Sequence, residues 1–447
     1  MDTSRLTIER ATYGADCIGH TEEGKTVFVA GAIPGDVVEA RPTDDGRSFS
    51  RAVAERILEP SPSRVEAPCP LVDVCGGCPW GHMAYGAQLE AKRANVMDAL
   101  TRIGHMDAAR AERLVAPCVA PAEPWGYRNK IELAFAHRNG RALMGMHDRA
   151  GTDVVKVSAC PLLQGDSAKL AKAVSGAVSY LANSHRLSFE RIGIRSSART
   201  REVEVALWTE PGPFPRAQVA KVVHEGTGAT SVVRVLTKGS SAKARRIVGV
   251  ERLWGKGSWG ELVGEERMRV SAPSFFQVNT RGAERLVDLV LAGLSPREDD
   301  AAMDLYAGAG TFTLPLARRV GWVDAVESYG PAIRDLRRNL EGAHLGNVDA
   351  VGGDVGREFP DTDADVIVVD PPRAGLAADV VAKLSSQPAR AIAYVSCDPA
   401  TLARDLGRFE RAGAFVPRSV TPVDLFPQTF HVETVTILRR IRGRRSA

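Results

Sequence analysis

From about residue 270 onward, short apolar runs alternate with segments that have the periodicity of amphipathic helices. Runs such as AAMDL, WVDAV and DVIVV each end in a loop and are followed by a helix-like stretch. Strands that alternate with helices of roughly 10 to 15 residues form a doubly wound parallel sheet of the Rossmann-like α/β class. Because such sheets bind their ligands at the carboxyl ends of the strands, we expect the functional residues there.

The whole chain has 447 residues, more than one hydrophobic core usually holds, so we expect further domains before residue 270. Residues 1–62 combine short β-rich runs with turn signals, which predicts an OB-like β-barrel. Residues 63–265 mix β-rich runs with helical stretches and are expected to form an α+β central domain. Residues 266–447 would then be the α/β domain. The apolar spacing over 84–106 predicts an amphipathic helix.

The composition excludes a chain that is disordered over most of its length, because 44% of its residues are hydrophobic and 25% are charged. We find no apolar run long enough to span a bilayer and no export leader, so we expect a cytoplasmic protein without membrane association. The net charge of +4 is too small to identify a partner. Four basic segments are either RNA-binding surfaces or solvated loops: 127–130, 195–201, 238–246 and 439–445.

A glycine loop follows the first predicted strand of the α/β domain, in the sequence DLYAGAG. Gly308 and Gly310 allow a tight turn and a close approach of the backbone to a ligand. Glu327 ends the next predicted strand, where an acid can hold two ribose hydroxyls. The loop lacks the patterns that bind pyrophosphate, which favours a nucleoside such as S-adenosylmethionine. The alternative is a structural turn with a surface glutamate.

Three further residues are predicted at the carboxyl edge of the same sheet. Asp370 follows the run VIVV and precedes two prolines, and Cys397 follows AIAYVS close to a helix N-terminus, which can lower the pKa of a thiol. Glu433 is an acid in an otherwise apolar strand, where burial would raise its pKa toward that of a general base. The alternatives are a loop-stabilising acid and a buried structural cysteine.

A thiolate, a base and a methyl donor in one site are the requirements for methylating carbon 5 of uracil. This carbon is a weak nucleophile until a thiolate adds to carbon 6 and converts the ring into an enolate. The enolate takes the methyl group, a base removes the proton from carbon 5, and the thiolate is eliminated. Cys397 would be the nucleophile and Glu433 the base, and a stacked uridine would have to be flipped out.

Five motifs together resemble the class I RNA (uracil-5-)-methyltransferases: FFQVN, DLYAGAGTFTLPLA, DPPRAGL, YVSCDPATLARDL and HVETVTIL. The first 60 residues resemble the TRAM domain of that family. The resemblance implies that Cys397 is the nucleophile and Glu433 the base, and that the helix at 84–106 packs with the catalytic domain. It also implies an S-adenosylmethionine site lined by Gln277, Tyr306, Glu327, Asp354 and Asp370 beside Gly308 and Gly310. Tyr306 and Thr311 depart from the phenylalanine and asparagine that are common in the family.

Four of the seven cysteines form a group in the central domain: Cys69, Cys75, Cys78 and Cys160. Cytosolic cysteines are reduced, so such a group indicates metal binding or catalysis rather than disulfides. The spacing resembles the iron-sulfur site of the ribosomal-RNA branch of the family, and four thiolates match a 4Fe-4S cluster. Zinc is the alternative, although its usual pair of CxxC units is missing. The spacing also differs from that of enzymes that cleave S-adenosylmethionine by radical chemistry.

The sequence therefore predicts a three-part RNA methyltransferase with a TRAM barrel, an iron-sulfur central domain and a Rossmann-like catalytic domain. We expect a monomer that acts on a uridine in 23S rRNA. The alternative substrate is a uridine in the tRNA T-loop. A different class, a non-catalytic iron-sulfur protein that binds RNA or carries electrons, would have no use for Cys397 and Glu433.

Overall fold

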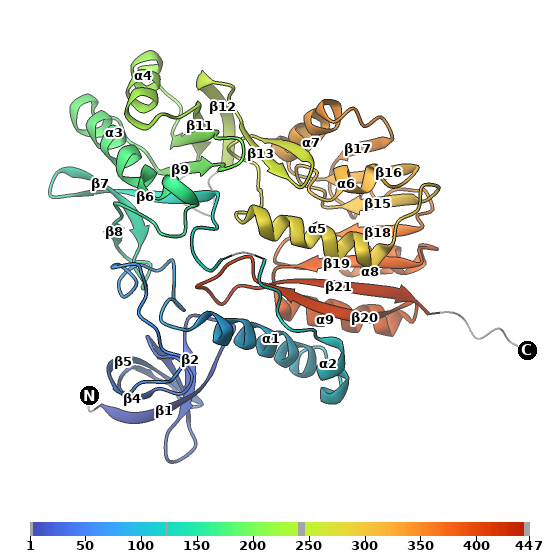
Figure 1. The fold of residues 1–447 in the computed structure, drawn as a ribbon, viewed down its shortest axis with the longest axis horizontal. Helices are drawn as coiled ribbons and strands as arrows, with labels where there is room; N and C mark the ends of the chain where they lie inside the picture. Colours follow the sequence, from blue (N-terminus) through green and yellow to red (C-terminus); the bar gives the residue numbers. More distant parts are fainter. Residues whose placement is uncertain (1–2, 122, 240–245, 442–447) are drawn as a thin grey trace, which may run out of the picture.

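The computed structural model describes residues 3–121, 123–239 and 246–441. A small barrel, a central sheet and a larger sheet follow one another along the chain (Figure 1). Within the described ranges, no helix has both the length and the apolar character needed to cross a bilayer.

The N-terminal part is a closed five-stranded barrel with the strand order β1-β2-β3-β5-β4. Its strands are β1 (Ser4–Ala11), β2 (Cys17–His20), β3 (Thr26–Ala30), β4 (Val37–Asp45) and β5 (Phe49–Glu59). Leu6 and Ile8 of β1 and Val38 of β4 point into the barrel and are buried, as alternate residues of a strand should be. The predicted small barrel is confirmed.

The central sheet has seven strands in the order β12-β11-β10-β9-β6-β7-β8. They are β6 (Lys130–Arg138), β7 (Arg141–His147), β8 (Val154–Lys156), β9 (Arg191–Ser196), β10 (Val203–Thr209), β11 (Ser231–Lys238) and β12 (Arg246–Gly255). Two helices, α3 (Leu170–His185) and α4 (Arg216–Thr227), cover one face, and a short 3-10 helix (Gly165–Lys169) precedes α3. Val178 of α3 and Val223 of α4 share a core with Leu133 and Ile194 of the sheet.

The C-terminal sheet also has seven strands, in the order β17-β16-β15-β18-β19-β21-β20. They are β15 (Ala301–Leu305), β16 (Trp322–Glu327), β17 (Val348–Gly352), β18 (Val366–Val369), β19 (Ala391–Ser396), β20 (Phe415–Val423) and β21 (Glu433–Arg440). Its helices are α5 (Thr280–Leu294), α6 (Thr313–Ala317), α7 (Gly330–Gly342), α8 (Ala378–Ser386) and α9 (Pro399–Ala412). Strands β15 to β19 pair in parallel, as expected, but β21 runs antiparallel between β19 and β20.

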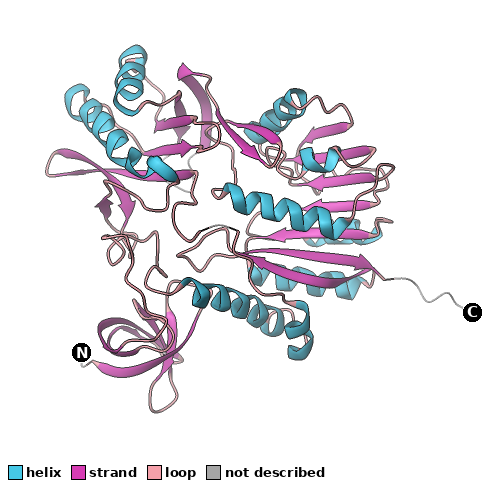
Figure 2. Cartoon of the chain, viewed as in Figure 1, coloured by secondary structure: helices cyan, strands magenta, loops and turns pink. Residues whose placement is uncertain are grey.

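Helices cover both faces of the C-terminal sheet (Figure 2), which makes it a doubly wound α/β domain. In β18, Ile367 and Val369 belong to the core beneath α8 and α9, whereas Val366 and Val368 belong to the core beneath α5. Because both faces are buried, this strand is apolar without alternation.

Two elements from earlier in the chain pack on the C-terminal domain. Helix α1 (Tyr85–Arg102) contributes Val96 and Leu100, and α2 (Ala108–Leu114) contributes Ala111, to the core that also contains Leu406 of α9. The hairpin of β13 (Trp259–Val263) and β14 (Glu266–Val270) shares a core with Leu336 of α7. The boundary expected after residue 265 therefore falls in the turn of a hairpin that packs on the C-terminal domain.

A buried ion pair joins α1 to the segment between β20 and β21. Both side chains, Lys92 and Asp424, are 0% exposed, and Lys92 also donates to the carbonyl oxygen of Phe426 at 3.1 Å. Gln88 and Gln428 add a second connection, because the Gln428 N–H donates to the Gln88 side chain at 2.8 Å. These contacts hold residues 424–428, shortly before β21 begins.

Replacing Lys92 by Met should lower the free energy of unfolding by about 3–5 kcal/mol, because it leaves a buried carboxylate without its partner. Chemical unfolding followed by circular dichroism measures this change. The matched control is Arg5→Met, which breaks the exposed pair with Glu59 and should cost less than about 1 kcal/mol. Equal losses for the two variants would contradict a structural role for the buried pair.

Candidate active site

The reversed direction of β21 brings Cys397 and Glu433 to the same edge of the sheet. Ser396, the last residue of β19, lies opposite Thr434 in the antiparallel pair. Cys397 follows Ser396 and Glu433 precedes Thr434, so continuing the register places these two residues opposite each other. Had β21 run parallel to β19, Glu433 would lie at the far edge.

Cys397 is partly buried between β19 and α9. Asp398 caps α9, because its side chain accepts hydrogen bonds from the backbone N–H groups of Ala400 and Thr401, each at 2.9 Å. Burial, together with the carboxyl groups of Glu433 and Asp370, raises the pKa of the Cys397 thiol to about 12. The expectation that this pKa is lowered is wrong, because burial and the adjacent acids raise it.

Glu433 is 3% exposed, and burial raises its pKa well above the usual value for a carboxyl, as the sequence predicts. Asp370 raises this pKa further, whereas the guanidinium of Arg373 opposes the shift. Among the described residues, the Oε2 atom of Glu433 has no hydrogen-bond partner. A buried carboxyl with a raised pKa and an unpartnered oxygen is suited to accept a proton from a bound ligand.

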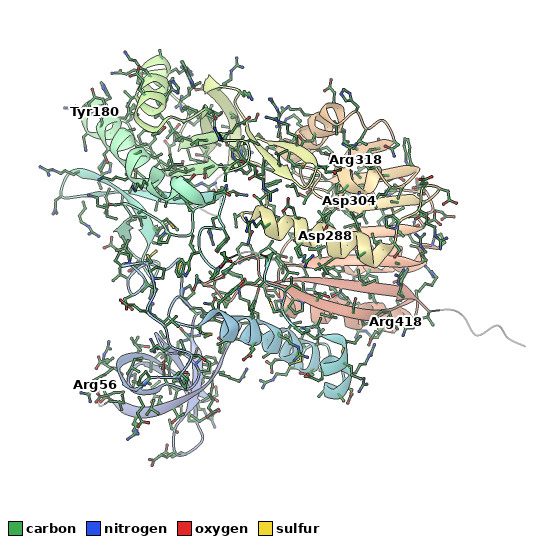
Figure 3. The ribbon with its side chains drawn as sticks, viewed as in Figure 1. Arg56, Tyr180, Asp288, Asp304, Arg318 and Arg418 are labelled. Atoms are coloured by element: carbon green, nitrogen blue, oxygen red, sulfur yellow. The ribbon has the colours of Figure 1, made fainter. Side chains whose placement is uncertain are left out.

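Three acids lie at the carboxyl ends of neighbouring strands. Burial raises the pKa of Asp370, after β18, to about 8, and that of Asp304, in β15, to about 7. Thr313 donates to one Asp304 oxygen at 2.6 Å, while the other has no partner among the described residues. Asp304, labelled in Figure 3, lies on the strand that leads into the glycine loop. Glu327, at the end of β16, accepts from the Gly308 N–H at 2.9 Å.

The glycine loop has the backbone geometry that its sequence indicates. Gly308 has a φ of +58° and open space where a Cβ would stand. Gly310 has a φ of +101°, and a Cβ there would lie 2.5 Å from Leu314 and 2.8 Å from Leu336. Both positions therefore require glycine. Tyr306 also has a positive φ, of +68°, which is uncommon for a residue with a side chain.

The remaining predicted cofactor residues lie on two loops. Asp354 is exposed after β17, and its charge helps raise the pKa of Tyr306, so the two side chains lie near each other. Gln277 precedes α5 and is buried, and its Oε1 has no partner among the described residues. Asn129 of the central domain donates to the Gln277 carbonyl at 2.9 Å. The role of Gln277 in lining an S-adenosylmethionine site stays a prediction.

The four cysteines of the predicted metal site line one small apolar cavity of about 30 Å³ beside Leu71 and Trp125. Three of these cysteines come from the loops before α1 and the fourth, Cys160, from the segment after β8. Among the described residues, no group of three or more His, Cys, Asp or Glu side chains is arranged to hold a metal ion. The four cysteines therefore line a common cavity, but in the described residues they are not arranged as a metal-binding group.

Comparison with known proteins agrees with this architecture. A family model described as tRNA (Uracil-5-)-methyltransferase matches residues 263–353 and 355–441, and a TRAM domain model matches residues 2–54. The chain is 33% identical to an uncharacterized RNA methyltransferase of Thermosynechococcus vestitus and 36% identical to one of Streptomyces coelicolor. The first match covers 95% of this chain and 96% of the relative, the second 95% and 90%. This chain belongs to the RNA (uracil-5-)-methyltransferase family.

A solved member of this RNA methyltransferase family has the same architecture. The tRNA (uracil-54, C5)-methyltransferase of Pyrococcus abyssi, in complex with S-adenosyl-L-homocysteine, superposes with a TM-score of 0.75 at 25% identity. The match covers 97% of this chain and 100% of that structure. The barrel and the methyltransferase fold of this chain are therefore shared across nearly its full length.

Two of the basic segments, 127–130 and 195–201, are buried in part, although Arg199 and Arg201 are exposed. Arg195 is 3% exposed and donates to the carbonyl oxygens of Ser271 and Ser274 at 2.9 and 2.6 Å. Asn129 is 1% exposed, so both segments join the central domain to the loop that carries Gln277. Parts of the other two segments, residues 240–245 and 442–445, lie outside the described residues.

Three residues near Cys397 and Glu433 were not predicted from the sequence. Arg373 and His431 stand inside motifs that the sequence analysis quoted, so their proximity to Cys397 and Glu433 could have been inferred. Burial lowers the pKa of His431 to about 4, which keeps the imidazole neutral at pH 7. Tyr13, from the barrel, donates to the Cys397 carbonyl at 2.8 Å. No local pattern indicates this contact, because 384 positions separate the two residues.

Replacing Gly310 by Ala should weaken binding of S-adenosylmethionine and lower the free energy of unfolding by about 1–3 kcal/mol, because the new Cβ is strained at this φ. Calorimetric titration and thermal unfolding measure the two effects. The control is Gly342→Ala, at the end of α7, where a Cβ meets nothing within 4 Å. A Gly310→Ala protein that binds the nucleoside like wild type would show that the loop does not require glycine.

Proposed function

We propose that this chain transfers the methyl group of S-adenosylmethionine to carbon 5 of a uridine in RNA through a covalent adduct at Cys397. The observation that carries the proposal is the register of β19 and β21, which puts a thiol opposite a buried carboxyl at the ligand-binding edge of the sheet. Family membership supports the reaction class, while the thiol and carboxyl supply the two groups that uracil chemistry needs.

The two residues have separate roles in the proposed reaction. The Cys397 sulfur bonds to carbon 6, and the electrons of the C5–C6 double bond move to make carbon 5 nucleophilic. Once carbon 5 carries the methyl group, Glu433 takes its proton, the C–S bond breaks and the double bond returns. Because burial raises the pKa of both the thiol and the carboxyl, each must lose its proton before it acts. The positive charge of Arg373 favours both ionised forms.

Several features of the glycine-loop edge fit S-adenosylmethionine, which supplies the methyl group when bound. Gly308 leaves open space above the loop, and Glu327 lies where ribose hydroxyls would be accepted. Gln277 and Asp304 offer buried oxygens without partners among the described residues. Tyr306, Asp354, Asp370 and Gly310 complete the proposed binding set.

Incubating the protein with RNA that contains 5-fluorouridine should trap a protein–RNA adduct, because fluorine cannot leave carbon 5 as a cation. Cys397→Ala should form no adduct. Glu433→Gln should accumulate a methylated adduct with natural RNA, since an amide cannot accept the proton from carbon 5. Denaturing gels and mass spectrometry detect both species.

The control for this experiment is Cys118→Ala, which removes a thiol that lies outside the proposed site. This variant should form the adduct at the wild-type rate. Adduct formation by Cys397→Ala, or normal turnover by Glu433→Gln, would overturn the assigned roles.

We also propose that Cys69, Cys75, Cys78 and Cys160 hold a 4Fe-4S cluster that stabilises the central domain and helps to dock RNA. The supporting observation is that four thiols from two separate segments line one apolar cavity. The cluster needs no redox role, because uracil methylation moves no net electrons.

Protein purified without air should be brown and contain about four irons per chain. Cys75→Ser should lose the iron and unfold at lower temperature, because metal-binding energy contributes to folding. Cys118→Ser is the control and should keep both properties. Stoichiometric zinc in a colourless anaerobic preparation would overturn the cluster.

The proposed substrate is a uridine in 23S rRNA, on the resemblance of the cysteine spacing to the ribosomal-RNA branch. A tRNA uridine is the second candidate, since the matched family model and the P. abyssi protein are both named for tRNA. Transcripts of 23S rRNA fragments should be methylated faster than tRNA transcripts when tritiated S-adenosylmethionine is supplied. Preferential labelling of tRNA would instead establish the second candidate.

A further inference from the structure

A residue of the barrel reaches the proposed nucleophile directly. Tyr13 lies in the loop between β1 and β2, and its hydroxyl donates a hydrogen bond to the backbone carbonyl of Cys397 at 2.8 Å. The barrel belongs to the first 60 residues, whereas Cys397 directly follows β19 of the C-terminal sheet. The barrel and this sheet are separate parts of the molecule (Figure 1). This bond therefore joins the domain expected to bind RNA to the segment expected to perform chemistry.

The loop that carries Tyr13 is held by its own contacts. Thr12 donates to the carbonyl oxygen of Asp16 at 2.7 Å, and Arg51 of β5 pairs with the Asp16 side chain at 2.9 Å. The tyrosine ring packs edge-on against Phe430, with ring centroids 5.6 Å apart and an interplanar angle of 83°. The hydroxyl is thus presented from a fixed position rather than from a free side chain.

The surroundings of the Tyr13 hydroxyl are those of the active site. Burial raises the pKa of this phenol, and the charges of Asp398, Cys397, Arg373 and Glu433 all act on it. A tyrosine phenol is protonated at neutral pH, and the raised pKa keeps it a hydrogen-bond donor at higher pH as well. After Cys397, the chain is held by Asp398, whose side chain caps the N-terminus of α9.

We propose that Tyr13 is a positioning residue that holds the Cys397 backbone so that the thiol faces carbon 6 of the uridine. Through this hydrogen bond, the position of the barrel affects the reactivity of Cys397. This inference rests on the proposed function. The Cys397 carbonyl lies in the same residue as the reacting sulfur, so losing its hydrogen bond can displace the sulfur. A small displacement of a nucleophile lowers the reaction rate without changing the affinity for the substrate.

The test uses Tyr13→Phe, which keeps the ring against Phe430 and removes only the hydroxyl. The rate of adduct formation with 5-fluorouridine RNA should fall about two- to tenfold, the effect of losing one hydrogen bond, while KM for RNA stays unchanged. The matched control is Tyr180→Phe on α3, which is 51% exposed and lies far from the barrel (Figure 3). This control should behave as wild type.

A second readout needs no RNA and separates this inference from the proposed function. Iodoacetamide labelling of Cys397, measured by mass spectrometry of its peptide, should be faster in Tyr13→Phe, because the released segment exposes the partly buried thiol more often. If wild type forms no adduct with RNA, the proposed function fails, but the labelling comparison still tests the coupling. Equal labelling rates, an unchanged adduct rate, or a raised KM with unchanged kcat would each overturn the positioning role.

Discussion

The site depends on one strand running against its neighbours. Strands β15 to β19 pair in parallel and deliver Asp304, Glu327, Asp370 and Cys397 to one edge of the sheet. Since β21 enters between β19 and β20 in the opposite direction, it starts where the other strands end. Its first residue, Glu433, therefore completes the group of polar side chains around Cys397. Without this reversal the Glu433 carboxyl would lie at the opposite edge of the sheet, away from the Cys397 thiol.

The position of β21 depends in turn on parts of the chain that lie far from it in sequence. Residues 424–432 lead into β21, and α1 holds them through the buried pair of Lys92 with Asp424 and through Gln88 with Gln428. The barrel approaches the same segment, because Tyr13 packs on Phe430. The three parts of the molecule therefore meet at the proposed active site, and buried contacts between them position Cys397 relative to Glu433.

Local patterns predicted the elements and much of the site, and contacts between distant segments supplied the rest. The barrel, the α/β sheet and the glycine loop follow from strand periodicity and turn residues, as at Gly308 and Gly310. The buried acid Glu433 was visible because a charge in an apolar strand is costly without a task. The raised pKa of the Cys397 thiol could not be predicted from the sequence, since it depends on burial and on acids from other strands. Arg195 looked like a surface residue because its partners, Ser271 and Ser274, lie over seventy positions away.

The central claim, that Cys397 drives methylation of a uridine in RNA, is tested most directly in cells. Total RNA from a strain that lacks this gene would be analysed for 5-methyluridine by position-resolved mass spectrometry, with the gene restored as wild type or as Cys397→Ala. The account predicts that one or more 5-methyluridines disappear and return only with the wild-type gene. An unchanged 5-methyluridine pattern, or its restoration by Cys397→Ala, would contradict it.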